Sequence, residues 1–343
     1  MTTRITIHDR LGRPLSEIEA IFNRSWVMND YGTGTITLTT RDMNTLENLL
    51  QFGNLVYAEH DSLPDWVGVV DQPRTWGNET VTITVYGYAY LLNWFITPKV
   101  MRVRGAGGGI FKELIDVAIN QYKCNYISYD EVYGGGGNHN LEFNFYPLFQ
   151  ALKTLMGKTN GNFYFDPYLN NKNELKIEAN YYRRMGALQN FTLYEGTNLT
   201  MVGAPLREQG KIVNRVTVYG QGSTWASRAA ATVSDSDSIS LYGVRHASYN
   251  SNNQTVNQLR TEAQNKLNKL AYPRISYKCE AIDVGDTFSW LRLGNTLRVE
   301  YYTAGFTDGA IGMKGLLRIK QMDYDEAQNK VVLYGEETDE SRL

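Results

Sequence analysis

Cysteine, proline and net charge are all scarce in this chain of 343 residues. Its two cysteines, Cys124 and Cys279, are too few for a disulfide framework and favour assembly under reducing conditions. The 34 Lys and Arg residues nearly balance the 36 Asp and Glu residues, which leaves a formal charge of -2. A chain without net positive charge lacks the electrostatic attraction on which a stand-alone DNA-binding protein depends.

Long apolar runs are missing as well. The longest nearly apolar stretch runs from about Tyr88 to Ile96 and contains Asn93. A transmembrane helix needs about 20 apolar residues, so we expect no membrane insertion by the chain itself. Residues 1–7 alternate like a strand and lack the apolar segment of a signal peptide, so we expect no ordinary secretion.

Tyrosine and glycine are abundant, with 24 and 31 residues against only 8 prolines. Tyr and Thr suit pleated, half-buried surfaces and Gly supplies turns and bulges, so the composition favours β structure. Many tyrosines with little charge also indicate surfaces that are buried against identical neighbours. A carbohydrate-binding surface leaves a similar composition, so both interpretations stay open.

The order of strand and helix patterns divides the chain into three parts and a tail. Residues 1–104 hold several short strand patterns and are predicted to form a first β-barrel domain. Residues 105–190 are predicted to be an α+β insert domain, and residues 191–335 a second β-barrel domain with a helix at about 253–271. Residues 336–343 are predicted to be a flexible tail. The predicted fold class is mainly β with a smaller α+β insert and two β-barrel domains of similar type.

Apolar spacing predicts the individual helices. Residues 88–94 have the length and apolar density of a short buried helix. Apolar residues recur at helical spacing from Ile110 to Ile119 and again from Leu148 onward, where Gly157 is a candidate end. A third apolar face at 256–270 precedes Pro273, which is expected to stop that helix. Between the helix that starts at Leu148 and the helix at 256–270, residues 162–166 and 174–178 predict a hairpin.

No residue pattern predicts a catalytic, cofactor-binding or metal site. The glycine-rich residues 105–109 precede a helix, but they lack the Gly-Lys-Ser/Thr and dinucleotide patterns that bind phosphates, so a hinge or a helix start is favoured. Residues 134–137 favour a mobile loop. The chain has four histidines, and none of them lies at metal-ligand spacing from another His or Cys: His8, His60, His139 and His246.

Two kinds of chemistry stay open because they depend on residues that are distant in the sequence. Cys124 or Cys279 could pair with a distant histidine, although buried filler is the favoured interpretation. Two of the 36 acidic residues could form a glycosidase pair, but the sequence selects none. The six tryptophans are predicted to anchor the core and interfaces, with a sugar platform as the minor interpretation: Trp26, Trp66, Trp76, Trp94, Trp225 and Trp290.

Five segments, taken in order, resemble the hub proteins at the tip of bacteriophage tails. That family includes the late-control proteins, the baseplate hubs of contractile phages and the N-terminal structural region of tail-associated lysins. The similar segments are a strand, turn, strand and buried Leu-Leu passage, a first insert helix, the strand opening a second barrel, a Ser-Ile-x-x-Tyr-Gly element and the closing strands. In the same order, they are residues 66–70 with 80–92, 105–119, 213–220, 237–245 and 293–299 with 317–319.

The resemblance implies a homotrimer that adapts a hexameric tail tube to a threefold tip. Three copies with two barrels each would make a ring of six, through which genomic DNA passes in transit. The implied partners are tail-tube and distal tail or baseplate proteins, and a spike, fibre or tape-measure protein. The implied location is the virion tail tip, after assembly in the host cytoplasm.

We expect no enzymatic activity, because the chain has no room for the enzymatic region that cell-wall-digesting relatives carry. We expect a near-neutral or acidic lumen, because basic residues there would hold phosphates. The alternative functions are a cell-wall-degrading tail lysin and a receptor- or sugar-binding tip protein.

Overall fold

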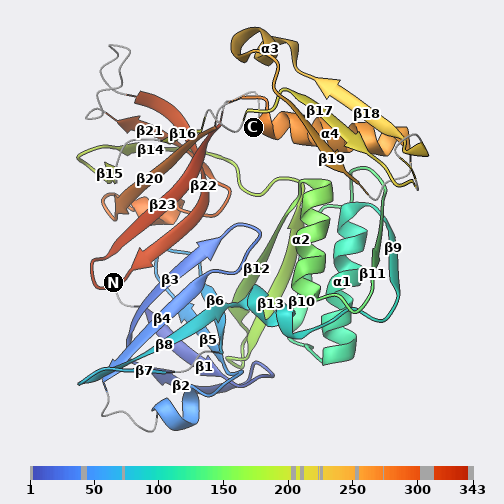
Figure 1. Ribbon diagram of the computed structural model, residues 1–343. Helices are drawn as coiled ribbons and strands as arrows, with labels where there is room; N and C mark the ends of the chain where they lie inside the picture. Colours follow the sequence, from blue (N-terminus) through green and yellow to red (C-terminus); the bar gives the residue numbers. More distant parts are fainter. Residues whose placement is uncertain are drawn as a thin grey trace. The chain divides into compact units, whose positions relative to one another are not determined.

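The computed structural model describes residues 3–39, 45–71, 74–201, 206–208, 212–222, 224, 227–251, 255–272, 274–301 and 313–338. The chain separates into two compact units. One unit combines Met1–Ala204 with Lys278–Leu343, and the other is Pro205–Tyr277. Strands dominate both sequence halves (Figure 1), so the predicted mainly β class with an α+β insert is confirmed. No helix among the described residues is long and apolar enough to span a membrane.

The first hundred residues supply half of a large, mostly antiparallel sheet. Its strands alternate buried and exposed residues, as Thr80–Gly87 does, because one face packs on the core. The elements are β1 (Arg4–His8), β2 (Pro14–Ile18), β3 (Ile21–Val27), β4 (Thr33–Thr39), η1 (Thr45–Leu49), β5 (Leu55–Glu59), β6 (Trp66–Val70), β7 (Thr75–Trp76), β8 (Thr80–Gly87) and the 3₁₀ helix η2 (Tyr88–Trp94). The short buried helix predicted at residues 88–94 is confirmed.

The closing strands join this same sheet. They are β14 (Leu188–Tyr194), β15 (Leu199–Met201), β20 (Arg274–Ile282), β21 (Thr296–Tyr301), β22 (Met313–Asp325) and β23 (Lys330–Thr338). The short 3₁₀ helix η5 (Thr287–Trp290) lies between β20 and β21 in the sequence. β22 pairs antiparallel with β3, which places Met322 opposite Trp26. The two β-rich stretches therefore share one sheet, and its fifteenth described strand is β16 (Leu206–Glu208), which pairs antiparallel with β20. Their division into two barrel domains stays a proposal.

The α+β insert stacks two helices on a small sheet. Its elements are β9 (Met101–Gly105), α1 (Gly107–Tyr122), β10 (Ile127–Val132), β11 (His139–Phe143), α2 (Leu148–Thr159), β12 (Asn162–Leu169) and β13 (Leu175–Tyr182). β12 and β13 form the predicted antiparallel hairpin, and β10 adds to β13 in parallel. β9 and β11 form a separate two-stranded ribbon. Both predicted insert helices are confirmed.

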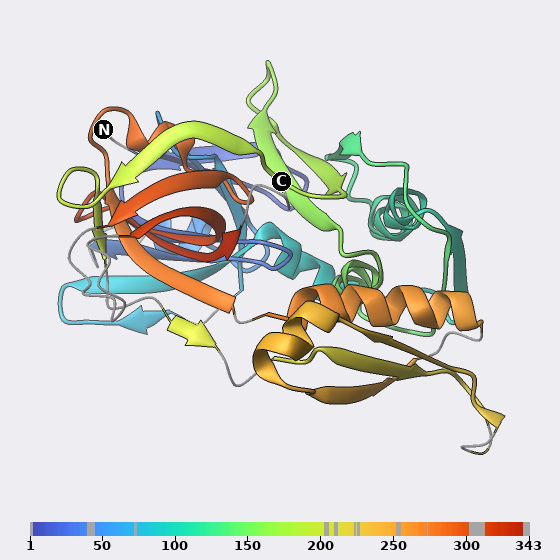
Figure 2. The same ribbon diagram turned by 90° about the horizontal axis from the view of Figure 1, so that it is seen from above.

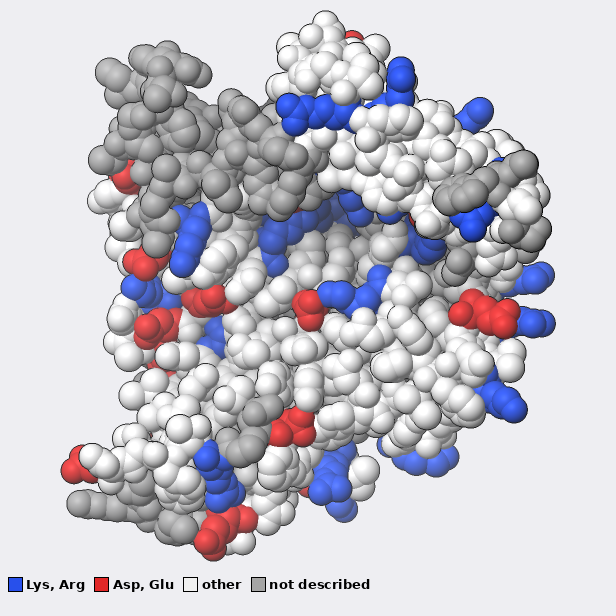
Figure 3. All heavy atoms as spheres, viewed as in Figure 1, with Lys and Arg blue, Asp and Glu red and all other residues white. Residues whose placement is uncertain are grey.

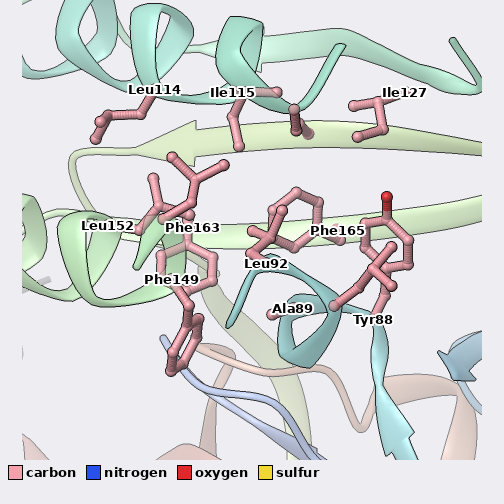
Figure 4. Packing of buried hydrophobic residues seen from close by; sticks show 14 of the residues in the cluster. Tyr88, Ala89, Leu92, Leu114, Ile115, Ile127, Phe149, Leu152, Phe163 and Phe165 are labelled. Carbon is pink, nitrogen blue, oxygen red and sulfur yellow. The ribbon is translucent and has the colours of Figure 1, made fainter. Parts of the chain in front are cut away.

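The insert and the first β region share one hydrophobic core. Phe149 and Leu152 of α2, Phe163 and Phe165 of β12, and Leu92 of η2 point toward one another (Figure 4). The same cluster continues to Leu55 and Val67 of the large sheet and to Leu114 and Ile115 of α1. Because one core serves both regions, burial of apolar surface ties the insert to the first β region.

The second unit, Pro205–Tyr277, has its own small sheet. Its elements are β16 (Leu206–Glu208), β17 (Arg215–Tyr219), β18 (Ala230–Ser234), α3 (Ser236–Tyr242), β19 (His246–Asn250) and α4 (Val256–Leu270). β17 lies between β18 and β19, antiparallel to the first and parallel to the second. Figure 2 shows α4 lying along this three-stranded sheet, and Leu259, Ala263 and Leu267 of α4 join its core.

Several sequence expectations need correction. The strand predicted at residues 213–220 is present as β17, which is the centre of a separate three-stranded sheet. That this strand opens a second barrel stays a prediction, because sequence patterning gives strand type but not the partner. α2 continues past Gly157 to Thr159 and is capped by Asn160, since asparagine also adopts the left-handed conformation that ends a helix.

The remaining boundaries shift by a few residues. The helix expected at about 253–271 begins at Val256, because the Thr255 side chain caps it by accepting a hydrogen bond from the Gln258 amide. Its expected stop, Pro273, lies outside the described residues. β23 continues to Thr338, so residues 336–338 of the expected tail belong to a strand. The rest of the expected tail, residues 339–343, lies outside the described residues.

Candidate interaction surfaces

The two most buried histidines have local structural roles. His8 is fully buried, and its ring nitrogens lie 3.0 Å from Thr6 Oγ1 and 3.2 Å from the Gly12 carbonyl oxygen. His60 Nδ1 accepts hydrogen bonds from the amides of Ser62 and Leu63. Burial lowers the pKa of both imidazoles, so they are held as neutral, bonded rings. Among the described residues, no three His, Cys, Asp or Glu side chains are placed to hold a metal ion.

The other two histidines and both cysteines are also not arranged as a nucleophile with a neighbouring base. Burial raises the pKa of Cys124 to about 11 and that of Cys279 to about 12, which keeps both as unreactive thiols. His246 Nε2 lies 2.8 Å from Thr217 Oγ1 in the second unit. Burial and nearby Lys158 lower the pKa of His139. No Cys–His hydrogen bond is present within the part of the chain that the structure describes.

The glycine-rich stretch at residues 105–109 is a tightly packed helix start, as predicted. α1 begins at Gly107, and a Cβ on that residue would lie 2.2 Å from Tyr181 Oη. A Cβ on Gly108 would lie 2.2 Å from the Tyr133 carbonyl oxygen. These two glycines allow the helix to approach neighbouring segments of the chain closely. Close packing therefore explains the glycines, and a phosphate-binding role is not needed to explain them. Residues 134–137 connect β10 to β11.

The tryptophans divide between the core and the surface. Trp26 and Trp66 are buried, and each indole donates to a backbone oxygen, at 3.3 Å to Asp65 and 2.9 Å to Ser25. The prediction of core anchors is therefore confirmed for these two. Three others are exposed: Trp76, Trp94 and Trp290. Trp225 lies outside the described residues.

Two carboxylates with raised pKa values lie where the insert meets the large sheet. Tyr57 Oη donates a hydrogen bond to Asp65, and burial raises the pKa of that carboxyl. Burial, Asp65 and Glu178 together raise the pKa of Asp166 to about 6. The adjoining cavity, lined in part by Asp65 and Tyr164, measures about 50 Å³. Such a volume holds water, whereas ligand pockets measure about 300–1,000 Å³. Asp65 lines this cavity, and Asp166 is not among its described lining residues.

An exposed apolar surface is built where the loop between η2 and β9 meets the loop between β11 and α2. We call it the apolar ridge: Ile96, Val100, Phe145 and Tyr146. The Thr97 amide donates to the Tyr146 carbonyl at 2.9 Å, and the Tyr146 amide donates to Thr97 Oγ1 at 3.0 Å. These bonds hold the loops together although 49 residues separate them in the sequence.

The apolar ridge is presented to solvent. Phe145 is 59% exposed and Val100 is 57% exposed. Phe145 also has a φ of +46°, a conformation that aromatic residues rarely adopt. Strained residues in ordered structure concentrate at functional sites, and contiguous exposed apolar side chains mark interaction surfaces. The sequence did not predict this ridge, because its members lie at no regular spacing.

Charged residues of both signs are interspersed on the large sheet. Over β22 and β23, acidic and basic side chains alternate (Figure 3). Lys320 pairs with Glu336 at 2.7 Å, and Lys330 pairs with Glu280 at 3.0 Å. Such mixed surfaces offer no extended positive field for nucleic acid.

Comparison with known proteins gives fold matches but no sequence match. No protein-family model and no curated protein matches this sequence. The prophage tail protein gp18 from Listeria monocytogenes EGD-e matches with a TM-score of 0.63 at 10% identity, over 99% of this chain and 96% of that one. The tail protein from Neisseria meningitidis MC58 matches with a TM-score of 0.60 at 12% identity, over 98% and 97%. The chain has the fold of phage tail proteins.

The E. coli c3393 protein is a further match, with a TM-score of 0.52 at 9% identity over 99% of this chain and 76% of that one. That protein is a component of the type VI secretion system and is structurally similar to the T4 bacteriophage tail proteins gp27 and gp5. The resemblance to tail proteins that the sequence indicated is thus confirmed at the level of the fold.

Proposed function

We propose that this chain is a structural hub protein of a phage tail tip or baseplate, or of a related injection machine. The observation that carries the proposal is the match to a prophage tail protein over 99% of this chain and 96% of that one. Such coverage supports a role for the chain as a whole. The step from fold to function is an analogy, since one fold can serve several functions.

In the proposed hub, three copies form a ring. Each copy contributes two β-barrel domains of similar type, so the ring presents six barrels to a hexameric tail tube and threefold symmetry to a spike or fibre. A closed ring requires heterologous contacts, in which two different surfaces of the chain meet. The exposed apolar ridge supports this arrangement, because removing its exposed apolar surface from water favours association.

The proposed hub lets genomic DNA pass and catalyses no reaction. The formal charge of -2 and the mixed charges over β22 and β23 support passage without tight binding. Its proposed partners are tail-tube, distal tail or baseplate proteins and a spike, fibre or tape-measure protein. Its proposed location is the virion, with assembly in the host cytoplasm.

Mass and symmetry in solution test the proposal. Light scattering of the purified chain at tens of micromolar is expected to give three times the 39.0 kDa of one copy. Averaged electron micrographs are expected to show a ring with threefold symmetry. A monomer under these conditions, or a twofold dimer, contradicts the hub. Changing Phe145 and Tyr146 to Ser is expected to lower the mass while a Trp290→Ser control keeps it.

A cell-wall lysin is the second candidate, because Asp65 and Asp166 have the raised pKa values that a catalytic acid requires. Incubating the purified chain with peptidoglycan separates the two functions. The hub releases no soluble fragments. A lysin releases fragments, and the Asp166→Asn variant abolishes that release.

A further inference from the structure

The Ser-Ile-x-x-Tyr-Gly element of the sequence lies in the second unit, on α3 and the loop that leads to β19. Ser238 is fully buried, and its Oγ donates a hydrogen bond to the Ala271 carbonyl oxygen at the end of α4. The half-buried ring of Tyr242 meets Tyr272 edge-on at a centroid distance of 6.4 Å. Gly243 has a φ of +72°, which turns the chain out of the helix. The named residues of the element therefore fix α3 against the end of α4.

A buried asparagine holds the loop that follows α3. Asn214 is fully buried, and its Nδ2 donates to the Gly243 carbonyl oxygen at 2.7 Å. Its Oδ1 accepts from the Arg245 amide at 2.7 Å, and its own amide donates to the Arg245 carbonyl oxygen at 3.0 Å. Because a buried amide side chain must be hydrogen bonded, these contacts keep the loop in one conformation.

Two aliphatic side chains project into solvent from this fixed segment. Leu241 is 68% exposed and Val244 is 57% exposed, and we call these two residues the aliphatic knob. The surface over α3 is mainly uncharged (Figure 3), and Asp237 is exposed in the first turn of the helix. Exposed apolar side chains that lie together on an ordered segment are typical of interaction surfaces.

The apolar ridge of a second copy has the chemistry that this knob requires. The ridge presents the rings of Phe145 and Tyr146, on which aliphatic side chains can pack. Lys99 is exposed within the ridge segment and carries the charge opposite to that of Asp237 beside the knob. Opposite charges at the rim of an apolar contact favour one orientation of the two partners.

We propose that the aliphatic knob of each copy packs on the apolar ridge of the next copy, with Asp237 toward Lys99. This inference rests on the proposed function, because a closed ring requires two different surfaces and the knob supplies the second one. Each copy then uses its ridge once and its knob once. Every ridge in the ring is covered, and its apolar side chains leave water.

Mixing two variant chains tests this pairing. Phe145→Ser with Tyr146→Ser removes the ridge, and Leu241→Ser with Val244→Ser removes the knob. By light scattering at tens of micromolar, each variant alone is expected to have the 39.0 kDa mass of one copy. An equimolar mixture is expected to give twice that mass, because one intact knob then meets one intact ridge and the chain of contacts ends there.

Val256→Ser is the matched control for the knob. Val256 is 47% exposed and begins α4, whereas the knob lies near the other end of that helix. The 15 residues of α4 separate the two ends by about 20 Å. This variant is expected to keep the trimer mass. All these side chains are exposed, so the thermal unfolding midpoint is expected to stay unchanged in each variant.

Thiol cross-linking tests the same contact without requiring a stable ring. The two natural cysteines are buried, with exposures of 4% for Cys124 and 1% for Cys279, so introduced thiols react first with a short bismaleimide. A Leu241→Cys chain mixed with a Phe145→Cys chain is expected to give a linked pair of copies. A Val256→Cys chain is expected not to link to the Phe145→Cys chain.

The outcomes separate the knob contact from the ring. A trimer that survives loss of the knob overturns this inference and keeps the proposed function. Absence of the Leu241–Phe145 cross-link also overturns it, as does a mixture that stays monomeric while the unchanged chain is a trimer. A cross-linked pair, when the unchanged chain is monomeric at tens of micromolar, rejects the ring and keeps the contact.

Discussion

Two hydrophobic cores among the described residues differ in size and in the residues that build them. One lies in the larger unit, joins the first β region, η2 and the insert, and contains Phe111, Phe149 and Phe163. The core of Pro205–Tyr277 consists of small and aliphatic residues, and none of its described buried members is aromatic: Val216, Val218, Ala231, Leu259, Ala263, Leu267 and Ala271.

This difference predicts unequal stability. Small domains bury a smaller fraction of their surface on folding, so they are less stable. We expect the second unit to open first under denaturant, while the insert and the first β region unfold together because they share one core. The changes below test that comparison.

Removing a large ring from the shared core has the largest expected effect. Phe111 on α1 is fully buried and stacks on Tyr181 at a centroid distance of 5.6 Å. The Phe111→Ala variant is expected to lose about 3–5 kcal/mol of unfolding free energy, because the change leaves a cavity. Urea unfolding measures the loss, and hydrogen exchange is expected to show lower protection in β5 and β6 as well as in α1. Glu113→Ala, an exposed neighbour, is the control and is expected to change stability by less than about 0.5 kcal/mol.

A substitution in the core of the second unit tests whether the two cores unfold independently. Leu259 on α4 is fully buried between α4 and its sheet. Leu259→Ala is expected to cost the second unit about 2–5 kcal/mol, which is a large part of the stability of a small domain. Amide exchange is expected to rise in β17 and α4 and to stay unchanged in β12 and β13. Equal loss of protection in both units would refute the separation of the two cores.

A pair of glycine substitutions tests how closely the insert is packed. Gly108→Ala places a Cβ 2.2 Å from the Tyr133 carbonyl oxygen, so we expect a loss of about 1–3 kcal/mol. The next residue provides the control, because a Cβ on Gly109 meets nothing within 4 Å. Gly109→Ala is expected to stabilise the helix by about 0.5–1 kcal/mol. Thermal unfolding of the two variants should shift in opposite directions, and a shift of the same sign would contradict the close approach of α1 to its sheet.

Local patterns in the sequence predicted the insert well. α1, α2 and the β12–β13 hairpin each depend on spacing over at most 21 residues, and such spacing reports the buried face directly. Pairing between distant strands was not predictable in the same way. β3 meets β22 about 300 residues later, and β17 pairs inside its own small unit. Many partners satisfy the same alternating pattern, so only the tertiary structure selects one.

The candidate surfaces were even less predictable. The apolar ridge joins two loops that 49 residues separate, without any motif in the sequence. For Trp76 and Trp94 the sequence predicted only that they anchor the core or an interface. What a sequence does provide is the residue type, and the abundance of tyrosine with balanced charge predicted surfaces for protein contact or carbohydrate binding, which stays a prediction.

The smallest expected effect concerns charge at the edge of the shared core. Asp166 on β12 lies directly opposite Glu178 on β13, so two acidic residues face each other across the strands. Burial, together with Asp65 and Glu178, raises the pKa of Asp166 to about 6 from an ordinary value of 3.8. The folded chain therefore binds this proton more tightly than the unfolded chain, and the contribution of Asp166 to stability falls as the pH rises from about 4 to about 6.

The Asp166→Asn variant removes this dependence. It is expected to be more stable than the unchanged chain by about 1 kcal/mol at pH 7, a value reduced because the carboxylate is partly exposed to solvent. At pH 4 the two proteins should be equally stable, since the carboxyl of Asp166 is then protonated in the folded chain. Urea unfolding at both pH values measures the difference, with Glu113→Gln on the exposed face of α1 as the control. Destabilisation by Asp166→Asn at pH 7 would mean that the ionised carboxylate holds the insert against the large sheet, and attraction to Arg292 would then outweigh the repulsion from Asp65 and Glu178.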